Sequence, residues 1–324
     1  YTDSSADPRE MAPDDPRLKS FEGVLPGFRL EATLNENALS GWLTELARKG
    51  YQIPEPLFDI YSPPETSDPR RFWRGPARYR AEDSDTAYIA DKVIDYTRLR
   101  RNEDWLIHAV FLRPHPPLIA PAPYDQLIDV ADIPKPVRHE TREREAARHP
   151  YLREWLKEMS NPGYFDAPFD VHALPEQDYE DMRAVYFGLI AEVDHQIGRI
   201  IDHLKATGEY DETLIIFTSD HGEMLGDHWC WGKGGFFDAS NHIPLIIRDP
   251  HAPPARYKPH GRFSPARQST LCARFFPDPA SRGTNGVRLR DHAICFVPRA
   301  QNETDRKDLR FARQRYVCRL QSPA

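Results

Sequence analysis

An aspartate and a histidine stand side by side at Asp220 and His221, directly after the apolar run of residues 214–218. A run of this length between polar residues is typical of a buried strand in a mostly parallel sheet. Ligands commonly bind at the carboxyl edge of such a sheet, because the strand fixes the backbone and the loop carries the chemistry. The pair suits Mn²⁺ or Zn²⁺ better than Ca²⁺, which prefers oxygen ligands. The plainer alternative is a loop cap beside a surface histidine.

A lysine follows in the glycine-rich segment WGKGG, where Lys233 lies between Gly232 and Gly234. Glycines let the backbone approach a ligand closely, and an ammonium group attracts an anion. We therefore expect Lys233 to bind an anionic ester.

A second histidine, His115, follows another apolar run of strand length, residues 105–112. It lies in the segment RPHPP, where proline forbids continuation of a strand and forces a loop. On its own this pattern favours a loop histidine held rigid by its prolines. Together with the Asp220 segment it favours an active-site histidine.

Both segments together resemble the sulfatase family of the alkaline phosphatase superfamily, in particular the branch of phosphonate monoester hydrolases and arylsulfatases. The resemblance runs with gaps from residue 1 to about residue 250. It implies that Asp220 and His221 are ligands of one divalent metal ion, that Lys233 contacts the anionic group, and that His115 assists the leaving group. In this family context we expect Mn²⁺ or Ca²⁺, with Zn²⁺ less favoured.

Two further residues match the family as substrate-binding positions. Tyr1 corresponds to a tyrosine that lines the pocket in the phosphonate hydrolase branch, although Asp3 departs from the threonine or histidine expected two positions later. His228 matches a frequent family residue, for which substrate contact and a supporting hydrogen bond are both open.

The chain departs from the family at the nucleophile. Relatives of this type carry a C-x-P-x-R or S-x-P-x-R segment whose cysteine or serine becomes formylglycine, and no C-x-P-x-R segment occurs here. Cys295 heads CFVPR, but the proline is one place late and the segment follows the metal pair. The family's N-terminal acidic pair is also absent. We expect that the first part of the enzyme is missing and that the chain as given is inactive.

The fold class that these patterns predict is α/β, an incomplete alkaline-phosphatase-like α/β/α sandwich with a mostly parallel central sheet. Charged and apolar residues alternate with helical period over residues 85–100. The strongest helix covers residues 178–207, ends at Gly208 and leads into the strand at 214–218 as a crossover helix does. Residues 244–247 add a further strand. We expect a partial hydrolase domain over residues 1–250.

Two connecting segments are predicted to be loops. Residues 134–148 are rich in charge and predict a solvated, mobile lid near the His115 loop. Residues 62–80 contain RRFWRG, for which a surface loop is favoured over a basic aromatic contact with substrate or a neighbouring subunit.

Residues 251–324 follow a different pattern, with 13 arginines against 2 lysines and three of the four cysteines. They show no convincing apolar period, so neither helix nor strand is predicted. A shifted reading frame is favoured over a basic nucleic-acid-binding tail.

Composition limits the function classes. A net charge of −7 over 324 residues argues against general nucleic-acid affinity. No apolar stretch approaches the ~20 residues of a membrane span, and four unclustered cysteines favour a reducing cytoplasm. A mean hydropathy of −0.68 with 31 prolines indicates long loops. A homo-oligomer is left open.

The sequence therefore predicts a metal-dependent hydrolase of sulfate, phosphonate or phosphate monoesters acting on a small anionic substrate. A phosphodiesterase or phosphomutase of the same superfamily and a non-catalytic anion-binding fragment are the alternatives.

Overall fold

The structure is a computed structural model of the chain. It describes residues 30–32, 34, 39–63, 67, 71–101, 103–158, 174–233 and 235–250, and the backbone of 292–298. The helices are α1 (Ser40–Arg48), α2 (Asp85–Leu99), α3 (Arg142–Ala146), α4 (Pro150–Glu158), α5 (Glu176–Thr207) and α6 (Asp238–Asn241). The strands are β1 (Ile107–Phe111), β2 (Thr213–Thr218), β3 (Leu245–Arg248) and β4 (His292–Pro298).

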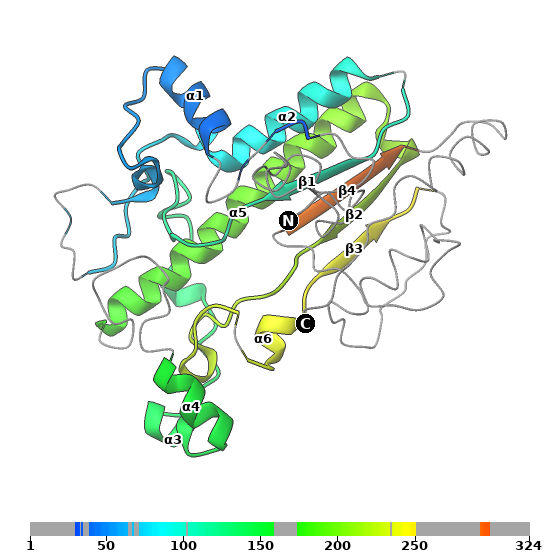
Figure 1. Ribbon diagram of the computed structural model, residues 1–324. Coiled ribbons are helices and arrows are strands. Elements are labelled where there is room, and N and C mark those ends of the chain that lie inside the picture. Colours follow the sequence, from blue (N-terminus) through cyan, green and yellow to red (C-terminus); the bar gives the residue numbers. More distant parts are fainter. Residues whose placement is uncertain are drawn as a thin grey trace, which may run out of the picture.

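The described strands form one sheet in the order β1-β4-β2-β3 (Figure 1). Each pairing is antiparallel, with Phe111 opposite His292, Thr218 opposite Ala293, and Ile215 opposite Arg248. The prediction of a mostly parallel sheet is therefore wrong for the described strands. β1 and β2 do run in the same direction, because each is antiparallel to β4, and β4 separates them. Their carboxyl ends consequently meet at one edge of the sheet.

β4 also corrects the prediction for residues 251–324, where neither helix nor strand was expected. The run AICFV is short and apolar, and its length fits a strand. The arginine-rich composition of the surrounding residues hides this signal when the segment is judged as a whole. The reading-frame and nucleic-acid hypotheses concern residues that lie mostly outside the described ranges.

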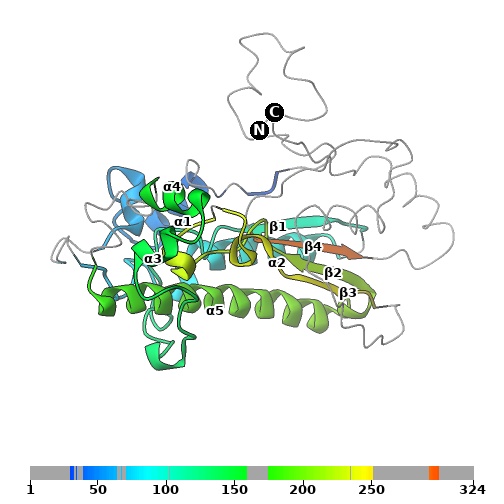
Figure 2. The same cartoon turned by 90° about the horizontal axis from the view of Figure 1, so that it is seen from below.

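Helices α2 and α5 lie on the same face of the sheet (Figures 1 and 2). α5 is helical because apolar residues recur every three or four positions, and its end is fixed by Gly208, whose φ of 79° permits the left-handed turn there. Ser84 is the N-cap of α2, and its hydroxyl oxygen accepts a hydrogen bond from the Ala87 N–H at 3.0 Å. Both helices were predicted to within about two residues.

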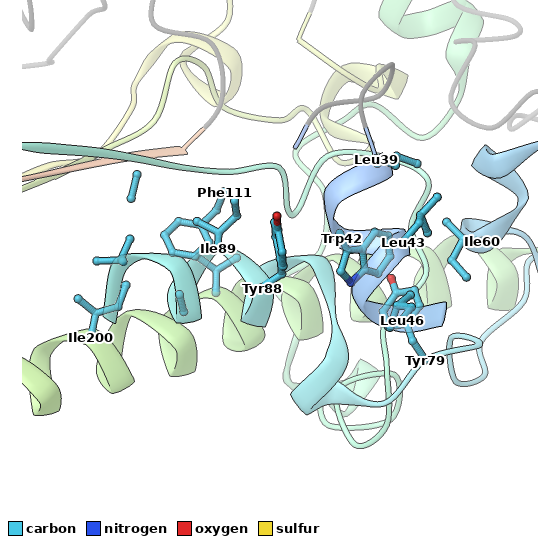
Figure 3. Packing of buried hydrophobic residues seen from close by; sticks show 14 of the residues in the cluster. Leu39, Trp42, Leu43, Leu46, Ile60, Tyr79, Tyr88, Ile89, Phe111 and Ile200 are labelled. Carbon is cyan, nitrogen blue, oxygen red and sulfur yellow. The ribbon is translucent and has the colours of Figure 1, made fainter. Parts of the chain in front are cut away.

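The main core joins both helices to α1 and the sheet (Figure 3). Its central side chains are fully buried, including Trp42 from α1, Phe111 from β1 and Ile200 from α5. Trp42 stacks on Tyr61 at 5.6 Å between ring centroids and meets Tyr79 edge-on at 5.1 Å. The contacts anchor α1 and the segment after it to the face that carries α2 and α5.

A second core cluster lies beneath the loops that follow β1 and β2. It contains Leu118 from the first loop, Trp231 from the second, and Met182 and Leu189 from α5. Trp231 meets Tyr179 edge-on at 5.0 Å, so α5 supports the backbone just before Lys233.

The helices of the described ranges include none with the length and apolar character of a membrane span.

Candidate metal and anion site

The loop after β2 turns away from the sheet at Gly222 and packs against α6. The Gly222 N–H donates to the Ser240 carbonyl at 2.8 Å, and the Thr218 hydroxyl donates to the Pro244 carbonyl at 2.9 Å. A Cβ at residue 222 would lie 2.0 Å from the Ala239 carbonyl oxygen. Glycine is therefore required by close approach, and this contact fixes where Asp220 and His221 lie.

Asp220 and His221 are arranged as a pair of ligand atoms. The His221 N–H donates to Asp220 Oδ1 at 2.8 Å, and His221 Nδ1 lies 2.8 Å from the Gly222 carbonyl oxygen. A carbonyl only accepts, so Nδ1 carries the hydrogen and Nε2 presents its lone pair. Nε2 is buried without a hydrogen-bond partner and lies 3.3 Å from Asp220 Oδ2.

Electrostatics favour the neutral imidazole that a metal requires. Burial lowers the pKa of His221 most, while the Asp220 carboxylate and the bond to Gly222 oppose it. A lone pair next to a carboxylate oxygen fits a divalent cation as two of its ligands. Among the residues that the structure describes, no group of three or more His, Cys, Asp or Glu side chains could complete such a site. Metal binding by Asp220 and His221 therefore stays a prediction with two candidate ligands among the described residues.

Lys233 and His115 lie in the same neighbourhood as this pair. The charges of both side chains lower the pKa of His221, which places them within electrostatic reach of its ring. Lys233 is exposed and His115 is partly buried. Lys233 from the loop after β2 and His115 from the loop after β1 thus lie within electrostatic reach of His221, and their roles toward an anionic ester stay predictions.

Glu223 fastens the lysine segment to the His221 loop. Its Oε1 accepts from the Gly232 N–H at 2.6 Å and from the Leu225 N–H at 3.2 Å. The Met224 N–H donates to the Gly232 carbonyl at 2.9 Å. These bonds close the loop of residues 223–232, so Lys233 follows directly from a fixed backbone.

His115 is oriented by its own loop. Its Nδ1 lies 2.8 Å from the Pro116 carbonyl oxygen, so that nitrogen carries the hydrogen and Nε2 is the other polar atom of the ring. Arg113, two residues before His115, is only 1% exposed and ion-pairs with Asp85 at 3.1 Å. Neither Arg113 nor Asp85 was predicted from the sequence to have a role at the site. The available signal was a charged residue directly after an apolar strand.

His228 is engaged by protein groups on two sides. Its Nδ1 lies 3.0 Å from Glu145 Oε1, and its ring stacks on Phe237 at 4.3 Å. The backbone is left-handed there, with φ of 55°. The ring therefore contacts a buried carboxylate, and a supporting role at the site stays a prediction. The substrate-binding role stays a prediction, and Tyr1 lies outside the described residues.

Residues 134–148 include α3 and are mostly exposed, as expected of the solvated lid or insertion that the sequence predicts, and one buried carboxylate fixes them to the His228 loop. Glu145 is fully buried and accepts from the His139 N–H at 2.8 Å and from Arg148 at 2.9 Å. Burial acts to raise the pKa of Glu145, but these donors and His228 outweigh it and the pKa is lowered. Trp229 Nε1 adds a bond to the His139 carbonyl at 2.9 Å.

The arginines of the RRFWRG segment pair with α5. Arg71 Nε donates to Asp178 Oδ2 at 2.6 Å, and Arg74 contacts Asp181 at 2.7 Å. Arg74 also donates to the Ile128 carbonyl at 2.7 Å. The segment thus runs along the surface, as favoured, and its arginines link it to α5.

The chain is similar to known proteins of one family. The profile of the family described as Sulfatase matches residues 28–270. The multifunctional alkaline phosphatase superfamily protein PehA of Trinickia caryophylli is 36% identical over 250 residues, covering 77% of this chain and 48% of that protein.

Solved structures agree as well. The phosphonate monoester hydrolase SpPMH of Silicibacter pomeroyi is 41% identical with a TM-score of 0.69, over 78% of this chain and 50% of that one. The phosphonate monoester hydrolase of Agrobacterium radiobacter is 42% identical with the same TM-score of 0.69, over 77% and 49%. The predicted fold family is thereby confirmed at this coarse level.

The chain spans about half the length of these relatives, 48% of PehA and 49–50% of the two hydrolases. The match to the family profile extends 20 residues past the predicted domain end at residue 250. With a profile match over most of its residues, the chain belongs to the sulfatase family of the alkaline phosphatase superfamily.

Proposed function

We propose that this chain carries the metal-binding and anion-binding half of a reaction centre that hydrolyses small anionic esters. The observation that carries the proposal is His221 Nε2, which is buried, unpartnered and 3.3 Å from Asp220 Oδ2. A buried nitrogen of this kind is costly without a partner, and a cation between it and the carboxylate would supply one.

Each residue has a distinct role in the proposal. Asp220 and His221 hold one divalent ion, which supplies positive charge to an ester oxygen when bound. Lys233 binds the anionic group through its exposed ammonium. His115, when protonated on both ring nitrogens, directs its Nε2–H toward the departing alcohol oxygen and donates that proton to it, leaving the ring with its hydrogen on Nδ1. The charges then stabilise the negative oxygens that develop in the transition state.

The substrate class comes from relatives together with the site. Two similar structures are phosphonate monoester hydrolases, and PehA is described as multifunctional. We therefore propose sulfate, phosphonate or phosphate monoesters as substrates. The family typically uses a metal and formylglycine, and this sequence has no C-x-P-x-R segment. Its S-x-P-x-R string, SDPRR, begins at Ser67, outside the loops after β1 and β2 that carry the proposed site. The proposal is accordingly that this chain binds ion and ester and needs a nucleophile from elsewhere for turnover.

Calorimetry with Mn²⁺, Ca²⁺ and Zn²⁺ on the full chain tests the metal half. We expect binding with a preference for Mn²⁺ or Ca²⁺. Asp220→Asn should weaken it by at least about tenfold. The control Asp202→Asn changes a carboxyl that is 78% exposed on α5 and should have no effect. If none of the three ions binds, the metal role is contradicted.

An ester panel separates the remaining candidates. It contains 4-nitrophenyl sulfate, 4-nitrophenyl phenylphosphonate, 4-nitrophenyl phosphate and bis(4-nitrophenyl) phosphate, each with a binding assay and a rate assay. Binding of the first three without turnover supports the proposal. Preferential hydrolysis of the diester favours the phosphodiesterase alternative. Sulfate binding that is indifferent to metal favours a non-catalytic anion-binding module.

A further inference from the structure

A buried charge lies directly beside the His115 loop. Arg113 and Asp85 are each 1% exposed, and Arg113 Nε donates to Asp85 Oδ2 at 3.1 Å. Asp85 also accepts from the Tyr61 hydroxyl at 2.9 Å and from the Thr86 N–H at 2.9 Å. Burying two charges is expensive and contributes little net stability, even with good geometry. The pair therefore invites a role other than stabilisation.

The remaining donors of Arg113 reach the loop that carries His115. Nη1 donates to the His115 carbonyl at 3.1 Å and to the Pro117 carbonyl at 2.7 Å. Nη2 donates to the Tyr79 hydroxyl at 3.2 Å, and the guanidinium lies 4.4 Å over the Tyr61 ring. The loop is rich in proline, which has no N–H, so it offers few backbone donors of its own. The guanidinium supplies them.

These bonds control the peptide that orients the imidazole. The His115 and Pro117 carbonyls flank Pro116, and the Pro116 carbonyl lies 2.8 Å from His115 Nδ1. If the flanking carbonyls move, the acceptor for Nδ1 moves with them. The tautomer and the direction of Nε2 then change.

We propose that Arg113, held by Asp85, is the positioning residue for His115. It fixes the backbone on both sides of Pro116, and the Pro116 carbonyl fixes the ring with its hydrogen on Nδ1. The role in ester hydrolysis rests on the proposed function of His115. The positioning itself is a property of the folded chain and is measurable without substrate.

Arginine is required by the geometry. A planar guanidinium reaches the carboxylate from one side and two carbonyls from another, whereas a lysine ammonium is a single point with three donors on a shorter stem. Arg113→Lys therefore keeps the charge beside Asp85 and gives up part of the hold on the loop. Asp85→Asn is the complementary variant, because it keeps the shape and removes the charge that orients Arg113.

The test is ¹⁵N-histidine NMR on the full chain, with the His115 signal assigned by His115→Gln. The wild-type neutral ring should show the tautomer with hydrogen on Nδ1. In Arg113→Lys that pattern should collapse toward a mixture, and amide deuterium exchange over residues 112–120 should accelerate about tenfold. The control is Arg74→Lys, because Arg74 likewise pairs with an aspartate at 2.7 Å and donates to a loop carbonyl.

Two results would overturn the proposal. One is a folded Arg113→Lys variant in which the His115 tautomer and the amide exchange of residues 112–120 are both unchanged. If Arg113→Lys does not fold, the same measurements on Asp85→Asn decide the question. The other is an equal change in the NMR signals of His195 and His203, two histidines of α5, which would indicate general loosening of the structure. Failure of the proposed function gives a different result: wild type that binds no ester, with the His115 response to Arg113→Lys still present.

Discussion

The loops after β1 and β2 leave the same edge of the sheet but are fastened by different means. The β1 loop depends on one buried guanidinium, Arg113, whose bonds reach Asp85 and two loop carbonyls. The β2 loop depends on many smaller contacts, among them the close approach of Gly222 to α6 and the two bonds to Glu223. The first arrangement should fail at once when its single ion pair is broken, and the second should loosen by degrees.

Removing the partner of the buried arginine should give the largest effect. Asp85→Ala leaves Arg113 inside the core without its carboxylate partner, and a guanidinium keeps its charge there because it is not deprotonated in proteins. Breaking a buried pair in this way costs ~3–5 kcal/mol. Urea or thermal unfolding measures it.

The matched control is Asp91→Ala. Asp91 pairs with Arg199 at 2.7 Å, but the two side chains are 43% and 39% exposed. An exposed pair of this kind contributes about 0–1 kcal/mol. Equal losses in the two variants would show that the β1 loop does not depend on a buried charge.

The next effect is on chemistry at the exposed end of the β2 loop. Lys233→Ala, in an enzyme that supplies the nucleophile to this half-site, should lower kcat/KM by ~10²–10³ because one contact to the developing charge is lost. The melting temperature should not change, since the side chain is exposed. Lys157→Ala, at a lysine that is 65% exposed on α4, is the control. A loss below about tenfold contradicts the assigned role.

A smaller effect should follow from crowding the turn after β2. Gly222→Ala places a Cβ 2.0 Å from the Ala239 carbonyl, so α6 or the Asp220–His221 loop must shift. Overpacking of this kind costs ~1–3 kcal/mol. Gly198→Ala is the control, since a Cβ there meets nothing within 4 Å and alanine favours the helix by up to about 1 kcal/mol. Stability and Mn²⁺ affinity should both fall only at Gly222.

Much of this comparison was accessible from the sequence. The strands before both loops and the crossover helix α5 were predicted because apolar periodicity and Gly208 mark them locally. The candidate residues of the β2 loop were singled out because an aspartate, a histidine and a lysine lie close together in the chain. The position of β4 between β1 and β2 could not be predicted from the sequence, because the pairing of strands that lie far apart in the chain leaves no local signal.

The supports of the site were harder to find than the site residues themselves. Asp85, Arg113 and Glu192 meet only in the fold, and each by itself reads as a surface charge. The docking of Glu145 beneath His228 was missed for the same reason, since a run of alternating charges predicts exposure. Sequence patterns report periodicity and proximity along the chain, whereas a buried charge depends on partners from other elements.

Glu192 on α5 offers the finest test of the β1 side. It is fully buried, close to the Arg113–Asp85 ion pair. Burial is the main cause that raises its pKa from 4.5 to about 8, and the charge of Asp85 adds to this, while Arg113, Ser84 and Thr86 act in the opposite direction. The group therefore stays protonated in the folded chain at neutral pH.

The sign of the pH dependence follows from these values. Between pH 4.5 and about 8 the unfolded chain releases this proton and the folded chain keeps it. The unfolded state then binds fewer protons, so the free energy of unfolding falls as pH rises, by at most about 1.4 kcal/mol per pH unit. Glu192→Gln removes the titration and should flatten the curve, with equal stability near pH 4.5 and a gain near pH 8. Glu176→Gln, at a carboxyl 69% exposed on the same helix, should leave the slope as it is. Parallel curves for wild type and Glu192→Gln in urea unfolding from pH 5 to 8 would mean that the buried charges beside the His115 loop are solvated, and the contrast between the two loops would lose its physical basis.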